Sequence, residues 1–118
     1  MDFKSDIEFM EKLVAGTPEL EALYREHLGF YNEILTHVLM GEISELVIST
    51  AADGRFPDWL ATLLEQMEAG LISGQAHITE LVAASFVENL CGEDRAIAAL
   101  MPKLGFALRR ALQRMCGP

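Results

Sequence analysis

Two histidine–glutamate pairs are spaced so that both side chains of a pair fall on one face of a helix. Glu33 and His37 are four residues apart, and His77 and Glu80 are three apart. Imidazole and carboxylate groups at this spacing are typical metal ligands. The Glu-x-x-His order that a di-iron bundle uses twice does not occur in the chain. We therefore expect solvated or hydrogen-bonded pairs, with a metal-dependent enzyme as the open alternative.

The motifs of the common enzyme classes are absent from the sequence. It contains no nucleophile elbow, no phosphate-binding loop and no dinucleotide-binding fingerprint. His27, beside Glu26, is expected to be an ordinary surface or boundary histidine. We therefore predict no catalytic residue, no metal and no cofactor, and a protein that acts by binding rather than by making or breaking bonds.

Acidic residues surround the segment from Gly41 to the Asp53-Gly54 turn and continue onto the next expected helix. They form either one negative patch or an ordinary solvated face. The only tryptophan lies beside the turn, where an exposed ring would be an interface anchor, although its place in an apolar stripe favours the core. The predicted partner-binding residues are Glu42, Glu45, Asp53, Asp58, Trp59, Glu65 and Glu68.

Charge is distributed unevenly along the chain. Residues 1–94 hold all 18 acidic side chains and four basic ones, a net charge of −14, whereas residues 95–118 hold five basic side chains and no acid. A body this acidic repels a phosphate backbone and an anionic membrane and attracts a basic protein. We therefore predict a basic protein partner, no nucleic acid and no membrane. Acidity that serves solubility alone is the alternative.

The start Met1-Asp2-Phe3-Lys4 lacks the basic and apolar regions of a secretion signal, and the longest apolar run, 96–101, is too short to span a bilayer. These features predict a cytoplasmic protein. Cys91 and Cys116 do not form a CxxC motif, so in a reducing compartment we expect free thiols, with Cys91 buried and Cys116 exposed.

Helix start and stop signals recur along the whole sequence. Ser5 and Glu8 form a capping box, Gly16 ends the first helix, and Pro18 opens the second. Gly41 is expected to interrupt a helix, and the strand-like segment 46–50 nevertheless keeps the helical period. The expected helices are 5–15, 18–28, 31–40, 42–52, 57–69, 74–90, 93–101 and 103–115.

The length of 118 residues suits one compact domain. Because every expected element is helical, the sequence predicts an all-α fold, a single domain over residues 1–118 built as a compact array of seven or eight short helices. An apolar share of 51% is slightly high for so small a chain, which leaves a self-associating scaffold or adaptor as one candidate function.

Two stretches carry a resemblance to a known family: Thr36-His37-Val38-Leu39-Met40-Gly41-Glu42-Ile43 and Ala84-Ser85-Phe86-Val87-Glu88-Asn89-Leu90. Together they resemble a family of small, uncharacterised, all-helical bacterial proteins similar to immunity proteins of polymorphic toxin systems. The similarity covers residues 30–115. The family brings no catalytic residues, and the matching positions His37, Gly41, Glu42, Glu88 and Asn89 are expected to be structural.

The resemblance implies a cytoplasmic immunity protein that binds a cognate bacterial toxin and neutralises it by occlusion. Such an inhibitor needs a rigid surface of complementary charge and no chemistry. The expected toxin is basic and acts in the cytoplasm, and the expected state of the chain is a monomer or homodimer. A self-associating scaffold without catalysis is the alternative.

Overall fold

The computed structural model describes residues 3–117, and every regular element in that range is helical. The predicted all-α array of seven or eight helices is confirmed. Met1, Asp2 and Pro118, which the predicted domain 1–118 also included, lie outside the described residues. The elements are α1 (Asp6–Val14), α2 (Pro18–Tyr31), α3 (Thr36–Ala52), α4 (Asp58–Leu71), α5 (Ala76–Val82), the π-helical turn η1 (Ala83–Val87), α6 (Glu88–Leu90), α7 (Asp94–Leu100), the 3-10 turn η2 (Met101–Lys103) and α8 (Phe106–Cys116).

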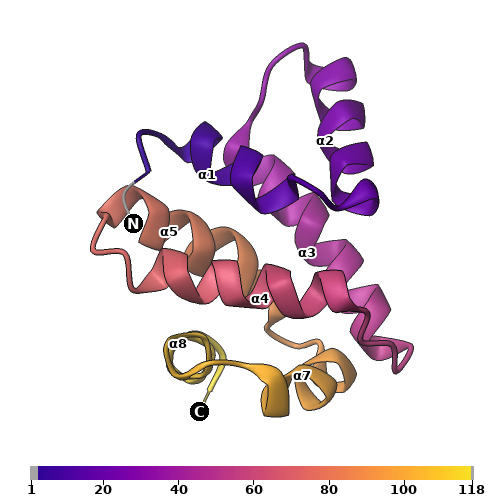
Figure 1. Cartoon of the computed structure of the whole chain (residues 1–118). Coiled ribbons are helices and arrows are strands. Elements are labelled where there is room, and N and C mark those ends of the chain that lie inside the picture. Colours follow the sequence, from indigo (N-terminus) through magenta and orange to yellow (C-terminus); the bar gives the residue numbers. More distant parts are fainter. Residues whose placement is uncertain (1–2, 118) are drawn as a thin grey trace.

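Helix α3 packs against most of the other elements (Figure 1). It contacts α1, α2, α5, η1, α6 and α7. Leu39, Met40, Ile43 and Val47 of α3 are fully buried. A helix covered on several sides needs apolar residues around much of its circumference, which explains the strand-like composition of 46–50. The prediction that 42–52 is helical is confirmed.

The predicted break at Gly41 is wrong, because α3 runs through it without interruption. A Cβ on Gly41 would lie 3.5 Å from Nδ2 of Asn89, so this glycine marks a close approach of α3 to α6. The predicted helix 31–40 also begins too early. Helix α2 continues to Tyr31 and ends at Asn32, which has a left-handed φ of 60° and donates its backbone N–H to the Leu28 carbonyl.

The predicted helix 74–90 is one continuous helical path, but it begins at Ala76 and contains the π-helical turn η1. Side-chain donors satisfy the backbone at this turn. The Ser85 carbonyl accepts hydrogen bonds from the Ser44 hydroxyl at 3.0 Å and from the Asn89 side-chain amide at 2.8 Å. The π turn therefore joins the middle of α3 to the end of α5, the helix that follows α4 and packs against it.

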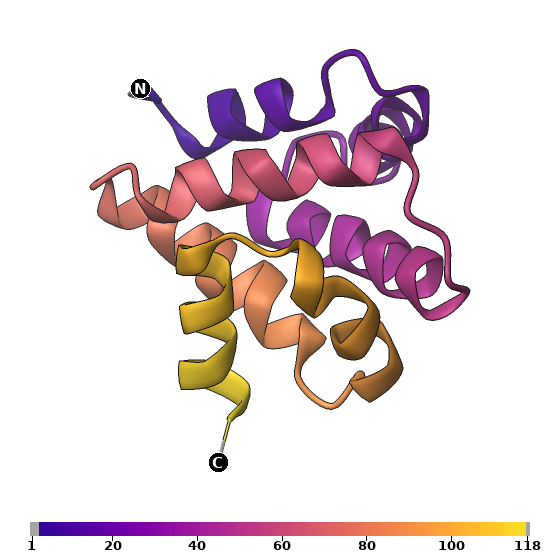
Figure 2. The same cartoon turned by 60° about the horizontal axis from the view of Figure 1, so that its bottom comes forward.

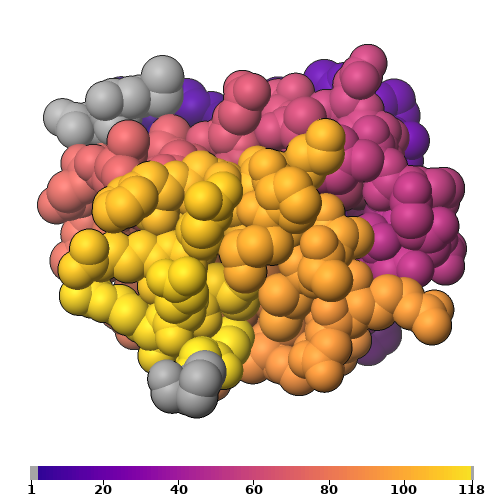
Figure 3. Space-filling model, turned by 90° about the horizontal axis from the view of Figure 1, so that it is seen from below, coloured from indigo at the N-terminus to yellow at the C-terminus, as the bar shows by residue number. Residues whose placement is uncertain are grey.

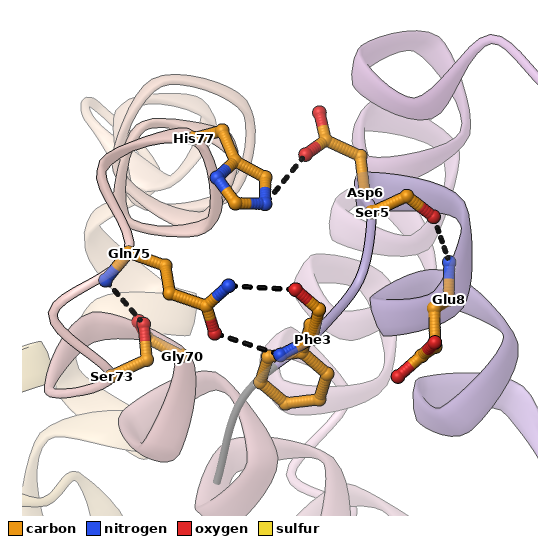
Figure 4. Close-up of polar contacts among 8 residues, drawn as sticks. All are labelled: Phe3, Ser5, Asp6, Glu8, Gly70, Ser73, Gln75 and His77. Carbon is orange, nitrogen blue, oxygen red and sulfur yellow. Dashed lines mark hydrogen bonds and ion pairs between the residues drawn. The ribbon is translucent and has the colours of Figure 1, made fainter.

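The N-terminal segment is tied to the start of α5 (Figure 4). The Gln75 side-chain amide donates to the Phe3 carbonyl at 2.7 Å and accepts the Phe3 N–H at 2.8 Å. The Phe3 ring is buried against Phe9, edge to face. The predicted cap at Ser5 is confirmed, since its hydroxyl accepts the Glu8 N–H at 3.1 Å.

A disulfide joins Cys91, just after α6, to Cys116 at the end of α8. The predicted free thiols are therefore wrong. The two residues are 25 positions apart, and nothing in their spacing shows that α7 and η2 turn the chain back (Figure 2) so that α8 packs beside α6. Within residues 3–117, no helix combines the length and the apolar character that crossing a membrane requires.

Candidate functional site

A buried histidine organises the corner where α2 meets α3. The His27 side chain is fully inaccessible, although α2 is otherwise largely exposed. Its Nδ1 lies 2.7 Å from Oε1 of Glu42, and its Nε2 lies 2.9 Å from the backbone nitrogen of Leu35. A backbone N–H can only donate, so Nε2 accepts and the ring's proton is on Nδ1, facing Glu42. This arrangement fixes the Glu42 carboxylate and the segment that leads into α3.

Two aromatic rings lie on the solvent side of this histidine. Phe30 is 81% exposed and packs edge to face on Tyr31, with ring centroids 4.8 Å apart. Tyr31 in turn contacts the His27 ring at 4.7 Å. An apolar ring held in the open by an aromatic neighbour is a typical anchor of a protein interface, because binding removes a large apolar area from water.

Acidic groups lie beside the Phe30 ring. Glu26 and Glu45 are exposed, and within residues 3–117 neither forms an ion pair. A hollow of about 350 Å³ lies among Leu23, Glu26, His27, Phe30, Glu42 and Glu45. We name the following residues the acidic corner: Glu26, His27, Phe30, Tyr31, Glu42 and Glu45. The exposed Phe30 ring and the unpaired carboxylates of Glu26 and Glu45 fit a partner that presents an apolar side chain among cationic ones.

The seven residues predicted to bind a partner do not form one patch. Glu42 and Glu45 lie in the acidic corner. Asp53 is exposed at the end of α3, with its carboxylate 3.8 Å from Arg55, and Asp58 is exposed at the start of α4. Trp59 is half-buried against the core. Glu65 lines a groove of about 590 Å³ between α1 and α4.

Glu68 has a structural partner inside the molecule. Its carboxylate accepts the backbone N–H groups of Ala107 and Leu108, both at 2.8 Å. These groups belong to the first turn of α8, where helical N–H donors lack partners in their own helix. Glu68 therefore caps α8 from α4, and it lies far from the acidic corner, since α2 and α8 occupy opposite corners of the molecule (Figure 1).

In both predicted histidine–glutamate pairs, the histidine contacts a residue other than the expected glutamate. His77 Nε2 lies 3.8 Å from the Asp6 carboxylate (Figure 4), so it connects α5 to α1. His37 Nδ1 lies within hydrogen-bonding distance of the Ser85 hydroxyl. Within residues 3–117, no three His, Cys, Asp or Glu side chains are grouped as a metal site would need.

The two stretches that carry the family resemblance pack against each other. His37 contacts Ser85, and Gly41 faces Asn89 one helical turn further on. A hydroxyl beside an imidazole is the nucleophile–base pair of a catalytic triad, which also requires a third group that orients the base. Within the described part of the chain, the hydrogen bonds of His37 include no such group. The contact instead holds α3 against the π turn.

Sequence reasoning missed His27, Phe30 and Tyr31 as site residues. The signal was present, because two aromatic residues directly follow Gly29. The predicted helix 18–28 ended before these aromatic residues, so they were not recognised as part of its surface. Once α2 is extended to Tyr31, His27 and Tyr31 are four residues apart and face the same side of the helix.

A family model covers nearly the whole chain. Residues 10–116 match the family described as a domain of unknown function, DUF7674. The chain belongs to the DUF7674 family. No curated protein matches this DUF7674 domain, and no solved structure does. The family description states no activity, so the resemblance of the DUF7674 domain to immunity proteins stays a prediction.

Proposed function

We propose that this DUF7674 domain is an immunity protein that binds a basic protein toxin through its acidic corner and neutralises the toxin by occlusion. The observation that carries the proposal is Phe30, which is 81% exposed in the last turn of α2 and stands among Glu26, Glu42 and Glu45. Burying such a ring at the centre of an interface supplies affinity, and the surrounding carboxylates supply charge selectivity and a faster encounter.

The corner is pre-organised for docking. The His27 hydrogen bonds to Glu42 and to the Leu35 N–H hold α2, α3 and their connection in one arrangement before a partner arrives. A surface that is rigid before binding loses little conformational entropy on binding. The net charge of −9 favours a basic protein over nucleic acid or an anionic membrane.

The proposal places the complex in the cytoplasm, where a toxin that acts there must be met. The Cys91–Cys116 disulfide weighs against this location, because such bonds persist mainly in oxidising compartments. Rapid alkylation of thiols during cell lysis, followed by mass spectrometry, measures whether the pair is oxidised in the cell. Because the docking surface is at α2 and α3, toxin binding should not depend on whether Cys91 and Cys116 are oxidised or reduced.

Co-expression with the product of the neighbouring gene tests the proposal. We expect a stable complex and rescue of cell growth, and we expect Phe30→Ala to weaken the complex at least about tenfold, about 1.4 kcal/mol. Phe106→Ala is the matched control, because Phe106 is 76% exposed on another face. The proposed surface would be contradicted if the toxin binds neither the wild type nor the Phe30→Ala variant. It would also be contradicted if Phe30→Ala and Phe106→Ala weaken toxin binding equally.

Charge reversals separate steering from anchoring in the same complex. Glu26→Lys with Glu45→Lys should lower the association rate most at low salt, where charges are least screened. Glu80→Lys with Glu88→Lys changes the net charge equally at exposed positions on α5 and α6. This control should lower the association rate much less than the Glu26→Lys and Glu45→Lys double variant does.

A further inference from the structure

The exposed large apolar side chains gather at two places within the described residues. Four lie at the end of α2 and the start of α3, three lie around α8 and the end of α4, and Ile7 lies apart from both. The first group is set among carboxylates. The second group is set among arginines. In order along the chain, the two groups are Leu28, Phe30, Tyr31 and Val38, then Ile72, Phe106 and Met115.

The second group forms a cationic surface of defined shape. Ile72, Phe106, Arg110, Arg114 and Met115 line a hollow of about 420 Å³, and we name these five residues the basic face. Ile72 is 69% exposed and Phe106 is 76% exposed. Figure 3 shows α8 and the end of α4 side by side on this side of the molecule. All five charged residues after position 94 are basic, so no acid of this segment offsets the arginines.

The acidic corner and the basic face lie at opposite corners of the molecule, because α2 and α8 do so in both ribbon views (Figures 1 and 2). One chain cannot bring its own two surfaces together. Contact between them therefore joins different copies, head to tail, and leaves one free surface at each end of the pair.

We propose that the basic face docks the acidic corner of a second copy of this chain. The two surfaces match in their apolar anchors and in the sign of their charges. Each presents an exposed phenylalanine as an apolar anchor, and each surrounds it with charges of the sign opposite to the other. An anionic membrane offers the same charge to the basic face but repels the remaining body, whose net charge over residues 1–94 is −14.

Self-association and toxin binding use the same acidic corner, so this inference rests on the proposed function for its biological meaning. A second copy and a basic toxin compete for one surface. In head-to-tail oligomers most acidic corners are covered by a second copy. A toxin of higher affinity binds the free chains and shifts the equilibrium away from the oligomers by mass action. The basic face does not take part in toxin binding.

Two triple variants test the heterologous contact. The corner variant carries Glu26→Ala, Phe30→Ala and Glu45→Ala. The face variant carries Phe106→Ala, Arg110→Ala and Arg114→Ala. All six side chains are exposed, so both variants should keep the wild-type helical signal and unfolding midpoint. Sedimentation velocity over a concentration series measures the assembly of wild type, of each variant and of their equimolar mixture.

We expect the wild type to form oligomers that grow with concentration and dissociate in high salt, and each variant alone to be monomeric. The mixture should form dimers and nothing larger, because it contains one intact corner and one intact face. A wild type that stays monomeric at millimolar concentration overturns the proposal, and so does a variant that self-associates alone or a mixture that stays monomeric. Binding of monomeric wild type to phosphatidylserine vesicles would instead assign the basic face to a membrane.

The same variants distinguish this inference from the proposed function. The face variant retains the acidic corner and should bind the toxin as tightly as monomeric wild type. If the mixture forms dimers while no toxin is bound, self-association stands and the immunity role fails. If the face variant binds toxin while the wild type is strictly monomeric, the immunity role stands and self-association fails.

Discussion

His27 shows how one buried side chain can determine a surface. The acidic corner presents exposed rings and carboxylates, yet its geometry depends on an imidazole that is fully buried. The ring satisfies a backbone N–H at the entrance to α3 and holds the Glu42 carboxylate, and Tyr31 packs on it. From the sequence, His27 beside Glu26 was predicted to be a surface or boundary residue, whereas the structure buries it. Its two real partners are eight and 15 positions away and become neighbours only when α2 and α3 pack.

Replacing this histidine should cost far more stability than replacing a surface one. We expect His27→Ala to lower the free energy of unfolding by about 2–4 kcal/mol, because it removes two hydrogen bonds and leaves a cavity and an unpaired Leu35 N–H. His37→Ala removes one exposed contact to Ser85 and should cost less than about 1 kcal/mol. Urea denaturation followed by circular dichroism measures both. Equal losses would show that the His27 contacts do not support the corner.

At the scale of helices, the sequence predicted the elements well and their boundaries less well. Gly16 ends a helix with a positive φ of 80°, whereas Gly41 lies inside one. Both glycines follow an apolar helical run, so local pattern alone does not separate them. What separates them is packing, because Gly41 faces Asn89 of a helix that the sequence does not place there.

The same limit applies to the site. Glu42 and Glu45 were predicted as partner contacts and lie in the acidic corner, because acids clustered beside Gly41 are visible in the sequence, although α3 runs through Gly41 without the predicted break. Glu68 was predicted because it continues the run of acids onto the next helix, yet it caps α8 across 39 and 40 positions of chain. The local sequence around Glu68 contains no sign of that long-range partner.

Two glycine substitutions should have opposite effects on stability. Gly41→Ala should raise the free energy of unfolding by about 0.5–1 kcal/mol, because alanine favours the helix and its Cβ would make an ordinary contact with Asn89. Gly105→Ala should lower it by about 1–2 kcal/mol. Its Cβ would lie 2.6 Å from the Glu68 carboxylate carbon and displace the cap of α8. Thermal unfolding of both variants measures the difference, and shifts of the same sign would contradict this account.

At the scale of the molecule, charge is separated in space as well as in sequence. The acidic residues spread over α1 to α6 and the start of α7, and the basic residues after position 94 lie on α7, η2 and above all α8. This separation gives the molecule an acidic end with exposed rings and a basic end with exposed apolar side chains. Both proposals depend on this polarity, which an even distribution of the same charges would not create.

The closing segment is also where the chain is covalently tied. The disulfide fastens the end of α8 to Cys91, 25 positions earlier, and closes a loop that contains α7, η2 and α8. Such a bond stabilises the fold mainly by restricting the unfolded chain, by about 3 kcal/mol for a loop of this length. The helices that position the two cysteines are held independently by buried leucines, including Leu90, Leu108 and Leu112. The reduced protein should therefore keep its fold.

We expect a reductant to lower the urea midpoint of the wild type while the helical signal of the native state stays unchanged. Cys116→Ser should show the lowered midpoint with and without reductant, because it cannot form the bond in either condition. Since α2 and α3 lie outside the closed loop, toxin binding by the acidic corner should be equal in both redox states. A wild-type midpoint that does not respond to reductant, with the bond shown by mass spectrometry to be broken, would mean that the unfolded chain gains no freedom from losing it.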